Sequence, residues 1–176
     1  MASELIATAL KTADETKAIA FGDDVLADTG KIFAAEFPGA KVLVVADENT
    51  FGAAGDVVVA SLKEAGVEFV EAPYVFPGTP TLYAGYENVE ILREHARPLE
   101  NTVICSIGGG TLNDIAKLAS GELDRPYMNV CTAASVDGYA SFGASIAKDG
   151  FKITRNCPAP VALVADNDVM AHAPQR

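Results

Sequence analysis

Residues 106–117 read Ser-Ile-Gly-Gly-Gly-Thr-Leu-Asn-Asp-Ile-Ala-Lys, and the three consecutive glycines join an apolar segment to a helical one. The preceding residues 102–105 are typical of a buried strand, and from Thr111 the apolar residues recur at helical spacing. Glycines at such a turn let a diphosphate approach the backbone, where free N–H groups and the positive end of the helix dipole face the anion. The alternative is a plain turn that needs a positive φ, for which one glycine is usually enough. The triple glycine therefore favours a phosphate cradle.

Strand-like and helix-like segments alternate around this turn. The predicted strands are residues 17–21, 41–46, 67–74, 102–106, 128–131 and 161–166. The predicted helices are residues 25–36, 51–65, 81–96 and 111 to about 120. This alternation predicts an α/β fold with a Rossmann-like, mainly parallel sheet flanked by helices, whose ligands bind at the carboxyl ends of the strands. The alternation stops after Thr132, and the Gly-, Ser- and Asp-rich residues 135–154 predict a hairpin or an active-site loop.

The composition is typical of one folded domain. The chain has 176 residues, 49% of them hydrophobic and 21% charged, so it can bury a sizeable core. A net charge of −11 without any basic block argues against nucleic-acid and anionic-membrane partners. No apolar run reaches the roughly 18 residues of a membrane span, and the N-terminus does not resemble a signal peptide, so we expect a cytoplasmic protein. The three cysteines are widely spaced, which predicts reduced packing residues and neither a disulfide framework nor a zinc site.

Asp47 follows directly after the predicted strand 41–46. A carboxylate at such a strand end can accept hydrogen bonds from both ribose hydroxyls of an adenosine, and it would repel a 2′-phosphate. In the common dinucleotide fingerprint the acid follows the glycine loop by about 20 residues, whereas Asp47 precedes the glycines. A helix N-cap is an equally good interpretation of this aspartate.

A second group of polar side chains follows the predicted strand 128–131. Its hydroxyl and carboxyl side chains are those of Thr132, Ser135, Asp137 and Ser141. They could bind a polar substrate or a nicotinamide ribose by hydrogen bonds. The nearest cations along the chain are Lys148, Lys152 and Arg155. A phosphate-bearing substrate would need such a cation, and a solvated loop is the alternative interpretation.

These segments together resemble the iron-containing alcohol dehydrogenase and dehydroquinate synthase superfamily. The matching motifs are Gly108-Gly109-Gly110-Thr111-Leu112-Asn113-Asp114, Ser135-Val136-Asp137-Gly138-Tyr139-Ala140-Ser141, Asp149-Gly150-Phe151-Lys152, and Ala165-Asp166-Asn167-Asp168-Val169 leading into Ala173-Pro174. The resemblance runs from about Ala18 to the last residue. The triple glycine is shared across the superfamily, whereas the second motif is more similar to its bacterial glycerol-1-phosphate dehydrogenase branch. The family places its ribose-binding aspartate before the glycine turn, which agrees with the position of Asp47.

The resemblance implies a dehydroquinate-synthase-like N-terminal domain and NAD(P)H-dependent interconversion of dihydroxyacetone phosphate and sn-glycerol 1-phosphate. It implies that Asp47 contacts the adenosine ribose and that Asp114 lies close to the diphosphate. The implied diphosphate contacts are Gly108, Gly109, Gly110 and Thr111. The implied nicotinamide contacts are Thr132, Ser135 and Ser141. Asp137 would lie between cofactor and substrate as a catalytic residue, and Lys152 would bind the substrate phosphate. A glycerol dehydrogenase, a dehydroquinate synthase and a non-catalytic nucleotide-binding module remain alternatives.

The chain departs from the family in its length. Family members are much longer and have a helical second domain that supplies the ligands of a divalent metal, namely an aspartate and two histidines. The histidines of this chain, His95 and His172, are isolated in the sequence, and we interpret them as surface or helix-end residues. We therefore expect residues 1–176 to be the NAD(P)-binding N-terminal domain without the helical domain, and to hold no metal. Zinc, nickel or iron is expected in a full-length protein only, and uncovered apolar surface would favour a homo-oligomer.

Overall fold

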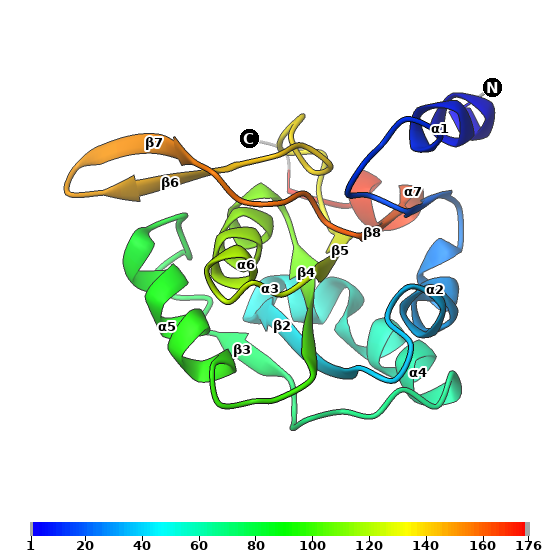
Figure 1. Ribbon diagram of the computed structural model, residues 1–176, viewed down its shortest axis with the longest axis horizontal. Coiled ribbons are helices and arrows are strands. Elements are labelled where there is room, and N and C mark those ends of the chain that lie inside the picture. Colours follow the sequence, from blue (N-terminus) through cyan, green and yellow to red (C-terminus); the bar gives the residue numbers. More distant parts are fainter. Residues whose placement is uncertain (1, 175–176) are drawn as a thin grey trace.

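Six parallel strands form the central sheet, in the order β1-β8-β5-β4-β2-β3 (Figure 1). The structure is a computed structural model that describes residues 2–174, with side chains described for residues 4–174. In sheet order the strands are β1 (Ala18–Gly22), β8 (Ala162–Asp166), β5 (Tyr127–Cys131), β4 (Thr102–Gly108), β2 (Lys41–Asp47) and β3 (Tyr74–Phe76). The prediction of a mainly parallel sheet flanked by helices is confirmed.

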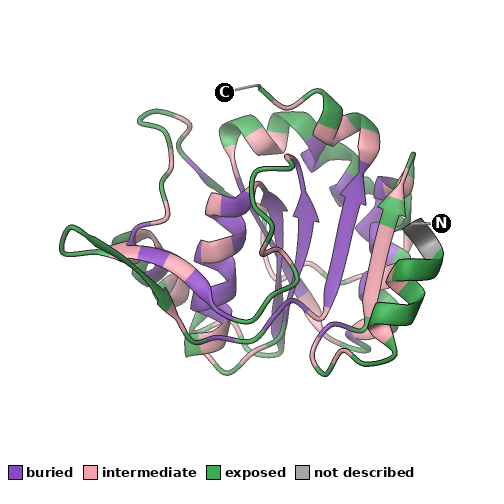
Figure 2. Ribbon diagram, turned by 90° about the horizontal axis from the view of Figure 1, so that it is seen from above, coloured by how far each residue is buried: buried purple, intermediate pink, exposed green. Residues whose placement is uncertain are grey.

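The middle of the sheet consists of strands that are mostly apolar on both faces. All residues of β4, β5 and β8 are buried, and Figure 2 shows these strands at the centre of the molecule. Strands that are covered by helices on both faces need apolar side chains on both faces, which is why their sequences do not alternate.

The order in which strands are added to the sheet reverses between β2 and β4. From β2 the chain continues outward to the edge strand β3, whereas from β4 it continues to β5 on the other side. The two strands pair with Ala46 beside Ile107, so their last residues, Asp47 and Gly108, end at the same level. A crevice opens at such a switch point, outside the carboxyl ends of the strands. The topology therefore directs a ligand toward Asp47 and Gly108.

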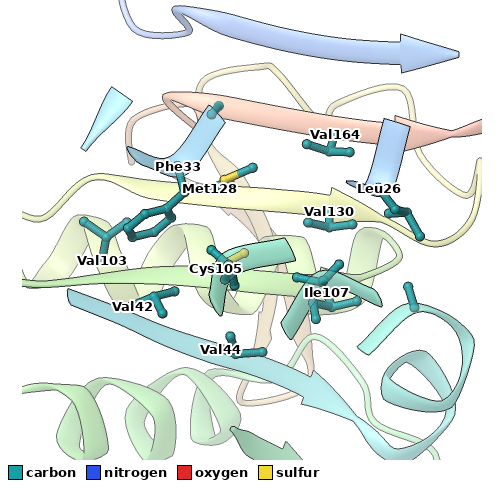
Figure 3. Packing of buried hydrophobic residues seen from close by; sticks show 14 of the residues in the cluster. Leu26, Phe33, Val42, Val44, Val103, Cys105, Ile107, Met128, Val130 and Val164 are labelled. Carbon is teal, nitrogen blue, oxygen red and sulfur yellow. The ribbon is translucent and has the colours of Figure 1, made fainter. Parts of the chain in front are cut away.

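Helices α2 (Thr29–Glu36) and α4 (Asp56–Glu64) cover one face of the sheet (Figure 1). Between these helices and the sheet lies a fully apolar layer, shown in Figure 3, in which Leu26 and Phe33 pack over side chains of β4 and β5. This layer holds α2 and α4 on the face of the sheet opposite the helix that follows the glycine turn.

Helices α5 (Tyr86–Ala96) and α6 (Gly110–Glu122) cover the opposite face. An antiparallel hairpin of β6 (Ala144–Lys148) and β7 (Phe151–Arg155) lies beside them and extends away from the sheet (Figure 1). Ile146 anchors the hairpin, because its side chain is fully buried against α5 and α6. Residues 135–154, predicted as a hairpin or a loop, thus contain both.

Two predicted segments differ in the structure. Of the predicted strand 67–74, only Tyr74 belongs to β3, and Phe69 makes one isolated bridge to Val42. Pro73 has no N–H to donate to a neighbouring strand, which explains why the regular strand begins only after it. The predicted helix 81–96 begins at Tyr86, because residues 81–84 are irregular and Gly85 occupies the N-cap.

The other predicted elements are confirmed, with additions at their ends. The predicted helices 25–36 and 51–65 each consist of two parts, with a 3₁₀ turn at Val25–Asp28 before α2 and a π-helical turn at Phe51–Gly55 before α4. The sequence analysis misses the short helices α1 (Ala2–Leu10), α3 (Glu48–Thr50) and α7 (Asn167–Ala171). Residues Gln175 and Arg176 of the resemblance lie outside the described residues.

Cys105, Cys131 and Cys157 are buried and free, which confirms the prediction of packing residues. Burial raises the pKa of the Cys105 and Cys131 thiols to about 12 and that of Cys157 to about 11. All three thiols are therefore protonated at neutral pH. Within residues 2–174, the helices are too short or too polar to cross a membrane.

Replacing Gly30 tests the contact between α2 and α4. The Gly30 N–H donates to Ser61 Oγ at 2.9 Å, and a Cβ at Gly30 would lie 2.1 Å from the Ser61 carbonyl oxygen. We expect Gly30→Ala to lower the free energy of unfolding in urea by roughly 2–3 kcal/mol, because the helices must separate. The matched control is Gly52→Ala, whose Cβ meets no atom within 4 Å. If both variants unfold at the wild-type midpoint, the two helices do not touch at Gly30.

Candidate functional site

A cleft of about 1120 Å³ lies at the carboxyl ends of the strands, where the switch point predicts it. One side is formed by α3 and the turn that follows it, through Asn49, Thr50 and Ala53. The start of α6 contributes Gly109, Gly110, Thr111 and Asp114, and the loop after β5 contributes residues 132–136. The remaining lining residues are Ala84, Lys152, residues 168–170 and residues 172–174. Segments distant in the sequence therefore meet around one hollow.

The three glycines at the end of β4 permit close contacts. None of them has a positive φ, so the alternative of a plain positive-φ turn is wrong. A Cβ at Gly108 would lie 2.6 Å from the side chain of Leu112, and a Cβ at Gly110 would lie 2.3 Å from the side chain of Val136. Gly108 therefore lets α6 pack on the strand end, and Gly110 lets the loop after β5 pack on α6.

Gly109 is the N-cap of α6, with an extended backbone at φ −75° and ψ −169°. The loop after β5 closes over this helix start, because the Gly110 N–H donates to Ser135 Oγ at 3.0 Å. The Tyr139 hydroxyl lies 3.3 Å from the same oxygen and donates to the Ala133 carbonyl at 2.6 Å. Burial raises the pKa of Tyr139 to about 12, so it remains a phenol at neutral pH. The Ser135 hydroxyl thus occupies a position at the start of α6 where an anion would accept hydrogen bonds.

Asp114 lies one turn into α6 and faces the cleft. Its Oδ2 accepts a hydrogen bond from the Ser145 N–H at 3.3 Å, which ties α6 to the hairpin. Burial raises the pKa of Asp114, and the nearby Lys117 ammonium opposes that shift.

Lys117 was missed by the sequence analysis as a candidate. Its side chain is fully buried, although lysine is among the residues least often found inside a protein. The signal that could have found it is its place in α6, where Ile115, Ala116, Leu118 and Ala119 around it are all buried. A charged residue within such an apolar run is expected only where its charge meets polar groups.

Asp47 ends β2 and is the N-cap of α3, so the N-cap interpretation is confirmed. Its Oδ1 accepts hydrogen bonds from the Asn49 and Thr50 N–H groups, both at 2.9 Å, and its own N–H donates to Thr50 Oγ1 at 3.0 Å. Asp47 is not among the described residues that line the cleft, but Asn49 and Thr50 are. Both bonds use the same carboxylate oxygen, so capping leaves Oδ2 able to accept from another donor.

The other candidates divide into two groups. Thr132, which is buried at the end of β5, and Lys152, on β7, both line the cleft. Asp137 and Ser141 are exposed residues of the loop after β5, and neither is among the described lining residues. The structure therefore gathers Gly109, Gly110, Thr111, Asp114, Thr132, Ser135 and Lys152 around the cleft. It leaves Asp47, Gly108, Asp137 and Ser141 outside its lining.

The two other cations of the hairpin point elsewhere. The ammonium of Lys148 lies 4.0 Å from the centroid of the Tyr86 ring, and the guanidinium of Arg155 lies 4.8 Å from it. Both cations therefore lie against the ring of Tyr86, the first residue of α5. Lys152 is the hairpin cation that reaches the cleft.

Asp168 and His172 of the cleft wall were missed as site residues, although they follow the predicted strand 161–166. His172 is the C-cap of α7, and its Nδ1 lies 2.7 Å from the Asp168 carbonyl oxygen. His95 is in the last turn of α5 and contacts the Glu71 carboxylate. Both histidines therefore lie at helix ends, as predicted. Within the part of the chain that the structure describes, no three His, Cys, Asp or Glu side chains come together as a metal site would require.

Solved structures of low sequence identity share the fold. NADH-dependent butanol dehydrogenase A from Thermotoga maritima superposes with a TM-score of 0.75 at 21% identity, over 92% of this chain and 45% of that one. Glycerol dehydrogenase from Schizosaccharomyces pombe superposes with a TM-score of 0.72 at 22% identity, over 90% of this chain and 39% of that one. These similarities support the α/β architecture described above.

Sequence comparisons identify the family. Glycerol-1-phosphate dehydrogenase (NAD(P)+) of Halalkalibacterium halodurans is 37% identical over 134 residues, which are 76% of this chain and 33% of that protein. The enzyme of the same name from Methanococcoides burtonii is 39% identical over 137 residues, which are 76% of this chain and 36% of that protein. The chain thus spans about a third of the length of these relatives. A model of the family described as iron-containing alcohol dehydrogenase matches residues 20–174, and the chain belongs to that family.

Proposed function

We propose that residues 1–176 form the NAD(P)-binding domain of an enzyme that interconverts dihydroxyacetone phosphate and sn-glycerol 1-phosphate. The observation that carries the proposal is the glycine turn, which opens the start of α6 into a large cleft at the switch point of the sheet. The names of the two relatives, which match three quarters of the chain at 37% and 39% identity, support the choice of cofactor and substrate.

The start of α6 fits the diphosphate of a dinucleotide. Gly109 carries no side chain between the helix N-terminus and the cleft, and its extended backbone needs no special φ. The N–H groups of the first turn and the helix dipole favour an anion at that point. The Gly110 N–H donates to Ser135 Oγ. A phosphate oxygen would therefore either share this N–H with the Ser135 hydroxyl or take the place of that hydroxyl. The cleft volume exceeds that of an ordinary small-molecule pocket, as an extended dinucleotide requires.

The other candidates take their roles from their positions around this point. We assign Asp47 Oδ2 to the adenosine ribose, and Thr132, Ser135 and Ser141 to the nicotinamide side. Asp114 lies near the diphosphate, and Lys152 is the cation available to a substrate phosphate. We assign Asp137 to the space between cofactor and substrate, which requires its exposed loop to turn inward. The cofactor itself supplies hydride transfer, and these side chains bind and orient it.

A divalent metal, which the family name implies, does not fit the described residues of this chain. His172 faces the cleft beside Asp168, but its Nδ1 is in hydrogen-bond contact with a carbonyl of its own helix, and no third ligand joins the two. No step of this proposal therefore passes through a metal. We assign zinc, nickel or iron to a helical domain outside residues 1–176.

We propose that the protein acts in the cytoplasm on a small phosphorylated triose. Its net charge of −11 argues against nucleic-acid and anionic-membrane partners. Self-association into a homo-oligomer is supported by exposed aromatic side chains in and around the hairpin, which are Tyr83, Phe142 and Phe151.

Titration of NADH into wild-type protein and Gly109→Ala tests the phosphate cradle. Alanine adopts the backbone of Gly109 without strain, and its Cβ would lie 3.1 Å from Ser135 Oγ, a hydroxyl that can shift. That methyl group would occupy space beside Ser135 at the start of α6, where we place the diphosphate. We expect calorimetry to show NADH affinity reduced by at least about tenfold, or about 1.4 kcal/mol, with the thermal unfolding midpoint retained. Equal NADH affinity of the two proteins would place the cofactor elsewhere.

Two substitutions at Asp47 separate its helix cap from its proposed ribose contact. Asp47→Ser keeps a capping oxygen but removes the carboxylate, whereas Asp47→Ala removes both and should cost about 1 kcal/mol of stability. We expect both variants to lose about 1–3 kcal/mol of NADH binding and to discriminate less against NADPH, because the charge-assisted ribose bond and the repulsion of a 2′-phosphate are lost. Unchanged NADH and NADPH affinities in Asp47→Ser would leave Asp47 with a capping role alone.

A further inference from the structure

The buried ammonium of Lys117 makes three hydrogen bonds, all to one loop. Its Nζ donates to the carbonyl oxygens of Gly138 at 3.0 Å, Ser141 at 2.8 Å and Gly143 at 3.3 Å. These carbonyls belong to residues 132–143, the segment that connects β5 to β6 and that we call the site loop. An ammonium has three N–H donors, so these carbonyls use its full donor capacity.

These three hydrogen bonds limit the chemical role of the Lys117 ammonium. With all three donors engaged by backbone, the ammonium has no N–H left for a ligand or a proton transfer. Burial lowers the pKa of Lys117, and Asp114, one turn earlier on α6, opposes that shift. The carbonyls provide the polar environment that a buried cation needs. The side chain is therefore suited to hold the loop in place and not to take part in chemistry.

Helix α6 holds the site loop at a second point. The N–H of Gly110 donates to Ser135 Oγ, and Gly110 precedes Lys117 by seven residues, which is about two helical turns and thus the same face of α6. The site loop carries Thr132 and Ser135 in the cleft wall and Asp137 between the two points of attachment. The position of these side chains relative to the cleft consequently depends on both attachments.

We propose that Lys117 is a positioning residue that holds the site loop against the nicotinamide half of the cofactor. The inference rests on the proposed function, since it assumes a dinucleotide with its diphosphate at Gly109. It assigns to Lys117 an effect on one half of the ligand only. The adenosine and diphosphate half contacts α3 and the start of α6, which keep their own hydrogen bonds without Lys117.

Comparison of NADH with ADP, which lacks the nicotinamide and its ribose, tests this assignment. Lys117→Met keeps an unbranched side chain of similar volume, one heavy atom shorter, and removes the three donors. We expect its NADH affinity to fall by about tenfold, as the loss of hydrogen bonds of this kind allows, while its ADP affinity stays within about twofold of wild type. The matched control is Lys31→Met, which removes one positive charge from α2 at a side chain that is 80% exposed. It should bind both ligands like the wild-type protein.

The outcomes are distinct. If Lys117→Met weakens both ligands equally, or neither, Lys117 is a residue of the general fold and the inference is overturned while the proposed function stands. If the wild-type protein binds neither ligand, the proposed function fails and the inference with it. Hydrogen exchange on the unmutated protein covers the case in which Lys117→Met does not fold. NADH should protect amides of residues 138–143 more than ADP does, and equal protection would contradict the inference.

Discussion

The joint between β4 and α6 is the constraint on which the rest of the site depends, because Gly108 and Gly110 leave no room for a side chain there. At Gly108 a Cβ would meet Leu112, and at Gly110 it would meet Val136. The first contact lets the helix lie on the end of its own strand, and the second lets a distant loop lie on the helix. Both contacts shape the wall of the cleft at a switch point, where the parallel sheet already opens. A side chain at either position would therefore disturb the packing and the cleft together.

The sequence predicts most of the sheet well, and the strand at the β3 edge poorly. Strands buried on both faces, such as β4 and β8, are mostly apolar, whereas residues 67–74 lie at an edge of the sheet and contain Glu68, Glu71 and Pro73. The positions of Gly109 and Thr132 at the cleft are predictable because parallel strands bring their carboxyl ends together. Lys117 is not, because its carbonyl partners lie 21, 24 and 26 residues further along the chain. The attachment of the loop depends on tertiary contacts that no local pattern encodes.

Positive charge is scarce at the cleft, and two charged side chains near it serve the fold. Asp47 uses one carboxylate oxygen to cap α3, and the ammonium of Lys117 donates its hydrogen bonds to carbonyls of the site loop. Among the described residues that line the cleft, Lys152 is the only lysine or arginine. Attraction for an anion then comes mainly from backbone N–H groups and the dipole of α6, whose effect is confined to the first turn. Such short-range, partly buried interactions are screened by salt less than exposed charge pairs are.

The three buried thiols can report how often parts of the folded protein open to solvent. A thiol must become both ionised and accessible before it reacts with an alkylating reagent, and Cys105, Cys131 and Cys157 meet neither condition while the chain is folded. Cys105 lies in the central strand between both helical layers, whereas Cys157 packs only in the layer of α5, α6 and the hairpin. The rate at which each thiol is modified would therefore measure how often its own layer separates from the sheet, without any introduced label.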